Sequence, residues 1–303
     1  MKDVIIIGGG PAGLTAALYA SRSGQSVLLL ESENIGGQIT AAPLVENFPG
    51  TPQISGMLFA DQLFEQVMAL GVELALEKAI KIIDQGDHKV VVTEDGRHSG
   101  RAVIIATGAK HRHLGLPREN DLIGQGISYC AVCDGAFYKN RTVAVVGGGN
   151  SAICEALFLS SICHKVFLIH RRDTFRADSS IVNRLASLDN VTFITGHVID
   201  SLEGDPALQG ILLRSVDTND VSRLEVDALF VAIGHAPDNR AFEPHVTLDE
   251  EGYIIASEDG TTNTPGIFVA GDCRKKTVRQ LTTAVGDGAN AATSAWGCNM
   301  NAV

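Results

Sequence analysis

The sequence predicts an α/β protein with parallel sheets, and three observations support that prediction. A buried apolar run at Val4–Ile7 leads directly into a glycine-rich turn and then a helical stretch. The same order of strand, turn and helix returns at residues 143–161. Glycine is abundant, at 32 of 303 residues, which suits tight turns between strands and helices. With 45% hydrophobic and 19% charged residues, the chain is long and apolar enough for one large folded domain or two ordinary ones.

The first unit of strand, turn and helix is complete by itself. Val4–Ile7 is typical of a buried parallel strand, the turn Gly8–Gly13 comes next, and Leu14–Ser23 is helical. Val27–Leu30 is the next strand, and Glu31 comes directly after it. A Gly-x-Gly-x-x-Gly turn between a strand and a helix is the pattern of a Rossmann dinucleotide site.

The second unit matches the first. Val143–Val146 precedes the turn Gly147–Ala152, a helix extends to about Ser161, and Val166–Ile169 is the next strand. Each unit also has a later strand that ends in glycine, at 103–108 and at 229–234. One such turn is a weak signal, but two in register predict two dinucleotide sites. The aligned turn positions are Gly8 with Gly147, Gly10 with Gly149, and Gly13 with Ala152.

The residue after the second strand of each unit indicates which ribose fits. Glu31 can accept hydrogen bonds from a free 2′-hydroxyl and would repel a 2′-phosphate, so site one suits FAD or NAD. Site two has His170, Arg171 and Arg172 there, with Arg176 a few residues later. Neighbouring guanidiniums favour a 2′-phosphate, which indicates NADP(H). The alternative is a solvated basic cluster, which fits poorly with a net charge of −11.

The net charge and the lengths of the apolar runs indicate which kinds of partner and location to expect. A net charge of −11 argues against binding to a phosphate backbone, so we expect no nucleic-acid partner. The apolar run at residues 4–7 is shorter than the roughly 7–15 residues of a secretory signal. No stretch approaches the roughly 18–20 apolar residues of a membrane span. We therefore expect a soluble, cytoplasmic protein that does not associate with a membrane.

Cys130 and Cys133 are the close pair among the 6 cysteines. A zinc site would need a second ligand pair, which the sequence lacks, so we expect no metal. Two inert buried cysteines are an alternative. A redox dithiol is favoured because a Cys-x-x-Cys loop closes easily and tends to lower a thiol pKa. Asp134 fits two interpretations equally: a turn residue before Gly135, or a proton carrier for thiol–disulfide exchange.

The two sites and the dithiol fit one chemistry. NADPH gives a hydride, whereas a disulfide takes two electrons and two protons. A flavin accepts the hydride and can pass the electrons on through a thiolate adduct. The sequence therefore predicts electron transfer from NADPH through FAD to a disulfide.

Over essentially its whole length the sequence resembles the low-molecular-weight, bacterial-type thioredoxin reductases, class II of the pyridine nucleotide-disulfide oxidoreductases. The motifs that carry the resemblance are Gly8–Gly13, Gly36–Gln38, Val45–Gly50, Cys130–Gly135, His170–Arg172 with Arg176, Gly271–Asp272, Arg279–Gln280 and Gly286–Ala289.

The resemblance implies two Rossmann-like FAD/NAD(P)-binding domains of three-layer ββα form, the second inserted into the first. The FAD-binding domain would comprise residues 1–113 and 245–303. The NADPH-binding domain, 114–244, would carry the dithiol. Double-stranded linkers would lie near Ala109–Leu116 and His235–Pro244, and a helix would begin near Ala289.

The resemblance also implies the site residues. For FAD these are Gly8, Gly10, Pro11, Ala12, Gly13, Glu31, Gly37, Gln38, Asn47, Ala106, Thr107, Gly108, Gly271, Asp272, Arg279, Gln280 and Leu281. For NADPH they are Gly147, Gly149, Asn150, Ser151, Ala152, His170, Arg171, Arg172, Arg176, Ile233 and Gly234. Catalysis would use Cys130 to attack the partner disulfide, Cys133 to face the flavin, and Asp134 as the acid–base residue.

The implied activity is that of an NADPH-dependent thioredoxin-disulfide reductase, working as a homodimer on thioredoxin or a similar small dithiol protein. One alternative is the reductase of a peroxidase system, which shares this core but generally adds a thioredoxin-like module. A second is a ferredoxin-linked reductase, which lacks either the dithiol or the arginine pair. A non-catalytic NADPH or redox sensor would need neither the dithiol nor both turns.

Overall fold

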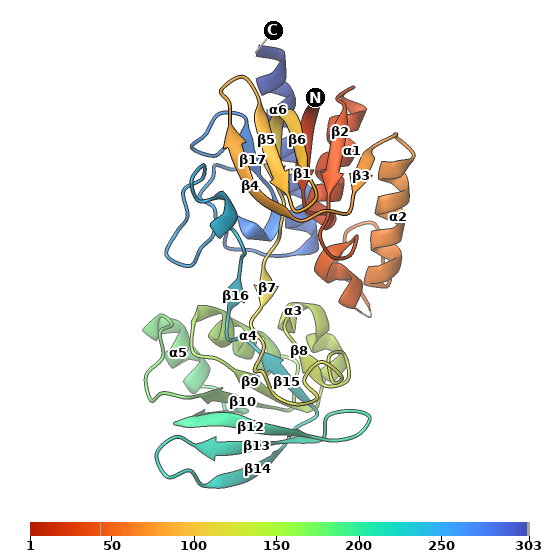
Figure 1. Ribbon diagram of the computed structural model, residues 1–303. Helices are drawn as coiled ribbons and strands as arrows, with labels where there is room; N and C mark the ends of the chain where they lie inside the picture. Colours follow the sequence, from red (N-terminus) through yellow and green to blue (C-terminus); the bar gives the residue numbers. More distant parts are fainter. Residues whose placement is uncertain (43, 302–303) are drawn as a thin grey trace. The chain divides into compact units, whose positions relative to one another are not determined.

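The computed structural model describes residues 1–42 and 44–301, which form two compact units (Figure 1). Within the described residues, unit 1 comprises 1–42, 44–110 and 236–301, and unit 2 comprises 111–235. The chain passes between them through two short paired strands, β7 (Lys110–His111) and β16 (His235–Ala236).

Unit 1 contains a sheet in the order β3-β2-β1-β6-β5-β4, with β17 also paired to β6. The pairs among β1, β2, β3, β6 and β17 are parallel, whereas β4, β5 and β6 form an antiparallel meander. The strands are β1 (Lys2–Ile7), β2 (Val27–Leu30), β3 (Glu73–Ala75), β4 (Ala79–Asp84), β5 (Lys89–Thr93), β6 (Arg97–Ile105) and β17 (Ile267–Val269).

Alternating side chains of the parallel strands fill two cores in unit 1. Val4 and Ile6 of β1 pack with the helices on one face, α1 (Pro11–Arg22), α2 (Gly56–Met68) and α6 (Leu281–Asn301). Ile5 and Ile7 pack on the other face against the β4–β5 meander and the region of Phe242. The carboxyl ends of the strands are thereby left to the turns that carry the predicted site residues.

The expectation that a helix begins near Ala289 is wrong, because α6 begins at Leu281. The Thr283 hydroxyl accepts a hydrogen bond from the Gln280 N–H (3.1 Å) and so supports an earlier start. The glycines of this segment do not break the helix. A Cβ on Gly288 would lie 2.3 Å from the Ala12 carbonyl oxygen, so glycine permits the close approach of α6 to α1.

Unit 2 has three layers (Figure 1). Its central parallel sheet has the order β11-β10-β9-β15-β8, and an antiparallel sheet, β12-β13-β14, covers one face. α4 (Asn150–Ser160) and α5 (Ser179–Ala186) cover the other face. The strands are β8 (Ile127–Ser128), β9 (Thr142–Val146), β10 (Lys165–His170), β11 (Val191–Thr195), β12 (His197–Glu203), β13 (Gly210–Ser215), β14 (Val221–Glu225) and β15 (Ala228–Val231).

The remaining elements are short helical turns. α3 (Ala131–Asp134) and the 3₁₀ turn η2 (Gly135–Tyr138) come after β8 in unit 2. Unit 1 contains the 3₁₀ turns η1 (Gly37–Ala41), η3 (Arg240–Phe242) and η4 (Gly271–Cys273). The predicted parallel α/β class is confirmed, and the predicted strands and helices of both turn units are present.

Candidate active site

Close backbone contacts require glycine at two positions of the first glycine turn. Gly8 has φ +112°, and a Cβ there would lie 2.3 Å from the Ala106 carbonyl oxygen. A Cβ on Gly13 would lie 1.8 Å from the Gly8 oxygen. At Gly10 the nearest atom would be 4.0 Å away, so the turn is open there. Gly10 is also the N-cap of α1 and makes no side-chain cap, which leaves backbone N–H groups for a phosphate.

Glu31 is buried and lies against this turn. Its Oε2 accepts a hydrogen bond from the Gly9 N–H (2.6 Å), and its Oε1 accepts from Ser32 and Glu33 N–H groups (both 2.7 Å). These three bonds fix the carboxylate in position. A carboxylate has about four acceptor positions, so it retains capacity for a ribose hydroxyl.

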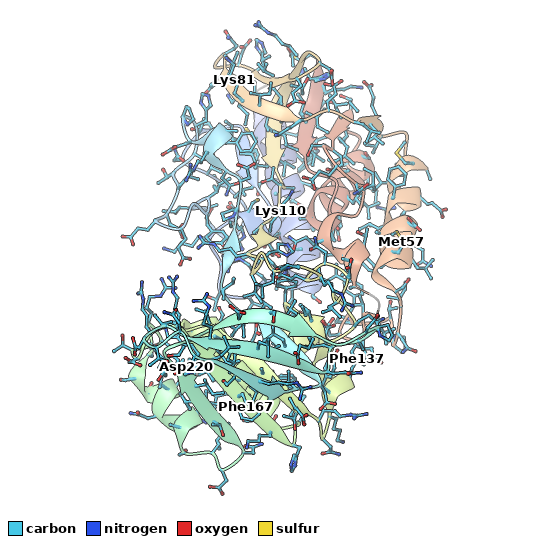
Figure 2. The ribbon with its side chains drawn as sticks, turned by 60° about the horizontal axis from the view of Figure 1, so that its bottom comes forward. Met57, Lys81, Lys110, Phe137, Phe167 and Asp220 are labelled. Atoms are coloured by element: carbon cyan, nitrogen blue, oxygen red, sulfur yellow. A yellow bond between two sulfur atoms is a disulfide. The ribbon has the colours of Figure 1, made fainter. Side chains whose placement is uncertain are left out.

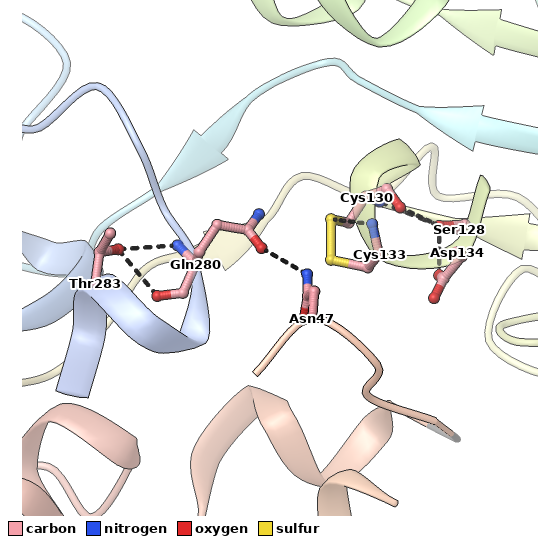
Figure 3. Close-up of a disulfide and its surroundings, with 7 residues drawn as sticks. All are labelled: Asn47, Ser128, Cys130, Cys133, Asp134, Gln280 and Thr283. Carbon is pink, nitrogen blue, oxygen red and sulfur yellow. Dashed lines mark hydrogen bonds between the residues drawn. A yellow bond between two sulfur atoms is a disulfide. The ribbon is translucent and has the colours of Figure 1, made fainter. Parts of the chain in front are cut away.

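Unit 1 gathers several predicted FAD residues at the same strand ends. Gly37 borders Gly10, at 3.3 Å for an added Cβ, and Gln38 donates to the Ala109 carbonyl. Asn47 donates to the Gln280 side chain (3.1 Å), as Figure 3 shows. Thr107 donates to Asn239 (3.3 Å). Ala106 and Gly108 lie beside Thr107 after β6, Gly271 begins η4, and Leu281 begins α6.

Two buried polar atoms in this region have no hydrogen-bond partner in the described chain: Arg279 Nε and Asp272 Oδ1, which lies 3.6 Å from Lys276 Nζ. Burial raises the pKa of Asp272, against the opposing effect of Lys276 and Arg279. The Arg279 guanidinium lies over the Tyr253 ring at 4.0 Å. Because buried polar atoms are nearly always satisfied, these two fit contacts to a polar ligand. The residues present therefore fit a flavin dinucleotide.

Asp287 supports this loop and was not predicted from the sequence. It lies on α6 and accepts from the Gly271 N–H (3.1 Å), from Arg274 Nε (2.9 Å) and from Lys276 Nζ (2.9 Å). Burial opposes ionisation, but the bonds from Arg274 and Lys276 and their charges lower the pKa of Asp287 below its usual value. The sequence offered one signal, an Asp within the Gly286–Ala289 motif, without its partners.

The second glycine turn repeats the first. A Cβ on Gly147 would lie 2.3 Å from the Ala232 oxygen, whereas Gly149 has no atom within 4 Å of an added Cβ. Gly149 is the N-cap of α4 and makes no side-chain cap. Asn150, at the start of α4, accepts from the Asp178 N–H (2.9 Å) and so ties the turn to a later loop. Ser151 and Ala152 come next on α4, and Ile233 and Gly234 lie after β15.

The basic cluster lies at the end of β10. Arg171 and Arg172 line a cavity of about 470 Å³. The Arg176 N–H donates to the Gly148 oxygen (2.8 Å), which holds this segment on the glycine turn. Burial lowers the pKa of His170, a backbone bond to Thr174 opposes this, and the three arginines lower it further. His170 also stacks on Phe175, with ring centroids 5.2 Å apart.

Cys130 and Cys133 form a disulfide with Cα atoms 5.3 Å apart (Figure 3). Cys130 caps α3, and its sulfur accepts from the Cys133 N–H (3.2 Å). Ser128 donates to Asp134 Oδ2 (2.6 Å). Burial raises the pKa of Asp134 despite this bond. A carboxyl that holds its proton more tightly beside a disulfide is suited to general acid–base work.

Sequence reasoning missed two carboxylates of unit 2. Glu119 is buried and accepts from Leu114 and Gly115 N–H groups (both 2.8 Å) and from the Tyr129 hydroxyl (2.7 Å). The second is Glu155 of α4, whose Oε2 is buried without a partner in the described chain. Burial raises the pKa of Glu155 to about 7. Neither has a motif around it that would have marked it.

Two nucleotide-type turns and a Cys-x-x-Cys disulfide define a class of protein, the nucleotide-dependent disulfide oxidoreductases. The model of the pyridine nucleotide-disulphide oxidoreductase family matches residues 2–288. The chain is 43% identical over 297 residues to a thioredoxin reductase of Mycolicibacterium smegmatis, covering 97% of this chain and 96% of that protein. It is 43% identical to a thioredoxin reductase of Listeria innocua, covering 94% and 90%.

A solved structure agrees with these relatives. The thioredoxin reductase of Streptococcus pyogenes superimposes with a TM-score of 0.95 at 41% identity, covering 99% of both chains. The chain therefore belongs to the thioredoxin reductases of the pyridine nucleotide-disulphide oxidoreductase family, whose members use FAD and NADPH. The predicted family and cofactors are confirmed.

Membrane spans and metal clusters are both absent from the described residues. No helix among residues 1–42 and 44–301 is long and apolar enough to cross a membrane. Within the same residues, no group of three or more His, Cys, Asp or Glu side chains is placed to hold a metal ion.

Proposed function

We propose that this protein reduces the disulfide of thioredoxin with electrons from NADPH, through FAD and the Cys130–Cys133 pair. The observation that carries the proposal is a disulfide formed between two cysteines of one short loop, in a unit that has its own open glycine turn. A structural disulfide of such a small loop stabilises a fold little, so reversible redox chemistry is its better explanation.

We assign the cofactors by unit, with FAD on unit 1 and NADPH on unit 2. The fixed Glu31 carboxylate supports FAD, as do the Asp272 and Arg279 atoms that lack a hydrogen-bond partner in the described chain. The arginine-lined cavity supports a 2′-phosphate. When bound, NADPH supplies a hydride and FAD passes the two electrons on toward the disulfide. Under this assignment the FAD-binding domain would correspond to unit 1 and the NADPH-binding domain to unit 2.

The dithiol acts by exchange. The Cys130 thiolate attacks one sulfur of the partner disulfide, which forms a mixed disulfide and releases one partner thiolate. The Cys133 thiolate then attacks Cys130 Sγ, releases the second partner thiolate and restores the Cys130–Cys133 disulfide. The Cys133 N–H that points at Cys130 Sγ stabilises the attacking thiolate. Asp134, whose pKa burial raises, supplies a proton to a departing thiolate.

The surface beside the disulfide suits a protein partner. Val132, between the two cysteines, is 53% exposed, and Phe137 of η2 is 47% exposed (Figure 2). Phe158 of α4 lies against Gly135, 3.0 Å from an added Cβ, and is 37% exposed. Exposed large apolar side chains that gather at one place mark protein-binding surfaces. Thioredoxin, or a similar small dithiol protein, would bind here.

The experiment that tests the function is NADPH-driven reduction of purified thioredoxin by the wild type and two serine variants. Cys130→Ser and Cys133→Ser should each abolish turnover, while NADPH still bleaches the flavin, because hydride transfer involves no sulfur. Cys133→Ser alone should accumulate a mixed disulfide with thioredoxin, since its attacking thiolate lacks a resolving thiol. Near-normal turnover by either variant would falsify the dithiol mechanism, and trapping on Cys133 instead would reverse the two roles.

We also propose a cytoplasmic homodimer. Tyr19 of α1 and Trp296 of α6 are 48% and 43% exposed and line a cavity of about 250 Å³ in unit 1. Aromatic side chains of this kind are enriched in subunit interfaces. Light scattering on the purified protein should give twice the mass of the 303-residue chain, and Trp296→Glu should give the monomer mass. Cell fractionation tests the location.

A further inference from the structure

A cavity in unit 2 brings together side chains from two separate sheets. It measures about 470 Å³ and is lined by Arg171, Arg172, Val198, Arg214 and Val216. The first two lie directly after β10 of the parallel sheet. Val198 lies on β12, Arg214 on β13 and Val216 directly after β13, all in the antiparallel sheet or at its edge. The cavity therefore has three guanidiniums and two apolar side chains.

The charges in this cavity are only partly compensated. Within the described chain, no carboxylate pairs with Arg171 or Arg172. Arg214 is half-buried, and its Nε donates to Asp200 Oδ1 (2.9 Å). In the same described part of the chain, its two Nη groups make no hydrogen bond. A guanidinium fixed through Nε, with both Nη groups unused, is oriented to bind a second anion.

We propose that Arg214 is a specificity-determining residue for NADPH, which supplies a third guanidinium to the 2′-phosphate of the bound nucleotide. Val198 and Val216 form the apolar wall against which the adenosine packs. This inference rests on the proposed placement of NADPH on unit 2 and extends it, because the 2′-phosphate site then includes a strand of the covering sheet. A dianionic phosphate is suited to several guanidiniums, and an adenine ring to apolar contact.

Asp200 acts on the same site with the opposite sign. Its carboxylate orients Arg214, but it also places a negative charge one side chain away from the phosphate. An asparagine there can still accept the Nε–H bond through its Oδ1 atom, without the charge. Asp200→Asn should therefore bind the 2′-phosphate more tightly than the wild type does.

The alternative is a purely structural role, in which the Arg214–Asp200 ion pair only joins β12 to β13. Partly exposed ion pairs of this kind contribute little, about 0–1 kcal/mol, to stability. Their loss would not distinguish nucleotides that differ by one phosphate. Arg223 on the neighbouring strand β14 provides a matched control, because it pairs with Glu203 (2.7 Å) and does not line the cavity.

The test is calorimetric binding of adenosine 2′,5′-bisphosphate and of 5′-AMP to the full-length, FAD-loaded protein. We expect Arg214→Gln to weaken the bisphosphate about tenfold, the effect of one charge-assisted hydrogen bond, and 5′-AMP less than about twofold. Arg214→Lys should lose less, because it keeps the charge. Arg223→Gln should change neither affinity, and Asp200→Asn should tighten the bisphosphate about twofold or more.

The outcomes separate this inference from the function beneath it. If Arg214→Gln matches Arg223→Gln while Arg171→Ala with Arg172→Ala weakens the bisphosphate, the role of Arg214 is wrong and the NADPH assignment stands. If the double variant also leaves bisphosphate binding unchanged, the assignment itself is wrong. Thermal unfolding of each variant shows whether it is folded, and Arg214→Lys replaces Arg214→Gln if the latter is not.

Discussion

The two glycine turns of this protein share a backbone and differ in the side chains placed at the end of the second strand. In unit 1 the Glu31 carboxylate accepts three backbone N–H groups and is fixed against its turn. In unit 2 Arg171 and Arg172 have no carboxylate partner in the described chain and line a cavity. If the turn binds phosphate in both units, as we propose, nucleotide choice depends on a few side chains beside it.

The turns also differ in how closely helix and strand pack. Gly13 has no room for a side chain, since a Cβ would lie 1.8 Å from the Gly8 oxygen. Its counterpart in unit 2 is Ala152, which is fully buried. The Ala152 Cβ lies beside Gly147, 2.7 Å from the position of an added Cβ on that glycine. Unit 2 therefore accommodates a methyl side chain at this position. The third glycine position of the turn (Gly13 or Ala152) therefore depends on helix packing, whereas we expect the second (Gly10 or Gly149) to depend on the ligand.

The largest expected effect comes from removing the two arginines that we propose bind the ribose 2′-phosphate in unit 2. Arg171→Ala combined with Arg172→Ala should raise the KM for NADPH by about two decades or more and leave the KM for NADH nearly unchanged. Each charge-assisted bond to a phosphate contributes roughly 1.5–3 kcal/mol, and 1.4 kcal/mol corresponds to a factor of ten. Steady-state kinetics with both nucleotides measure this. Equal damage to both would mean that the pair supports the fold and does not read the 2′-phosphate.

The second prediction distinguishes Gly13, which we expect to be required for helix packing, from Gly149, which we expect to be required for nucleotide binding. Gly13→Ala should destabilise the protein by about 3 kcal/mol, the upper end of an overpacking penalty, because the clash is with backbone. Gly149→Ala meets no atom within 4 Å and should leave stability unchanged within about 1 kcal/mol. It should instead weaken NADPH binding. Denaturant unfolding and nucleotide titration test both, and equal stability of the two variants would contradict the assignment.

The third prediction concerns the carboxyl group of Glu155 in unit 2. Glu155 has a pKa of about 7, raised by burial from its usual 4.5. Folding therefore favours its protonated form, so its contribution to stability is complete below pH 4.5 and is lost as the pH rises to 7. The total is about 3 kcal/mol. Relative to the wild type, Glu155→Gln should gain about that much stability between pH 4 and pH 8, measured by urea unfolding. A pH-independent difference would refute it.

Much of this molecule was predictable because its determinants are local. Val4–Ile7, the glycine turns and the Cys130–Cys133 pair each specify structure or chemistry within a few residues. The features that could not be predicted come from strands far apart in sequence. Arg214 reaches the cavity of Arg171 because β12–β13 folds over the parallel sheet, and the period of that hairpin does not specify which sheet it covers.

The start of α6 is a second case of this kind. Gly286 and Gly288 suggest a helix end when read locally, but Gly288 is explained by its contact with α1. The long-range contact outweighs the low helix propensity of glycine, which costs about 1 kcal/mol.

The smallest expected effect concerns Glu119, a buried carboxylate of unit 2 that, like Glu31, accepts hydrogen bonds from backbone N–H groups. Burial opposes its ionisation, but the bonds from Leu114, Tyr129 and Gly115 lower the pKa of Glu119. Burial and the Glu119 carboxylate raise the pKa of Tyr129, so its hydroxyl stays protonated and donates to Glu119. It must then accept from His113 Nδ1 (2.8 Å). The network joins the segment after β7 to the residue that precedes Cys130.

Tyr129→Phe should cost about 1 kcal/mol of unfolding free energy, because Glu119 keeps its backbone donors and loses one bond. His113→Ala should cost less once the hydroxyl is gone, which a double-mutant cycle of Tyr129→Phe and His113→Ala measures. By contrast, Glu119→Ala should cost more than Tyr129→Phe, since it leaves the N–H groups of Leu114 and Gly115 without an acceptor. If all three variants unfold like the wild type, Glu119 does not fix the loop, and its likeness to Glu31 is limited to accepting backbone N–H groups.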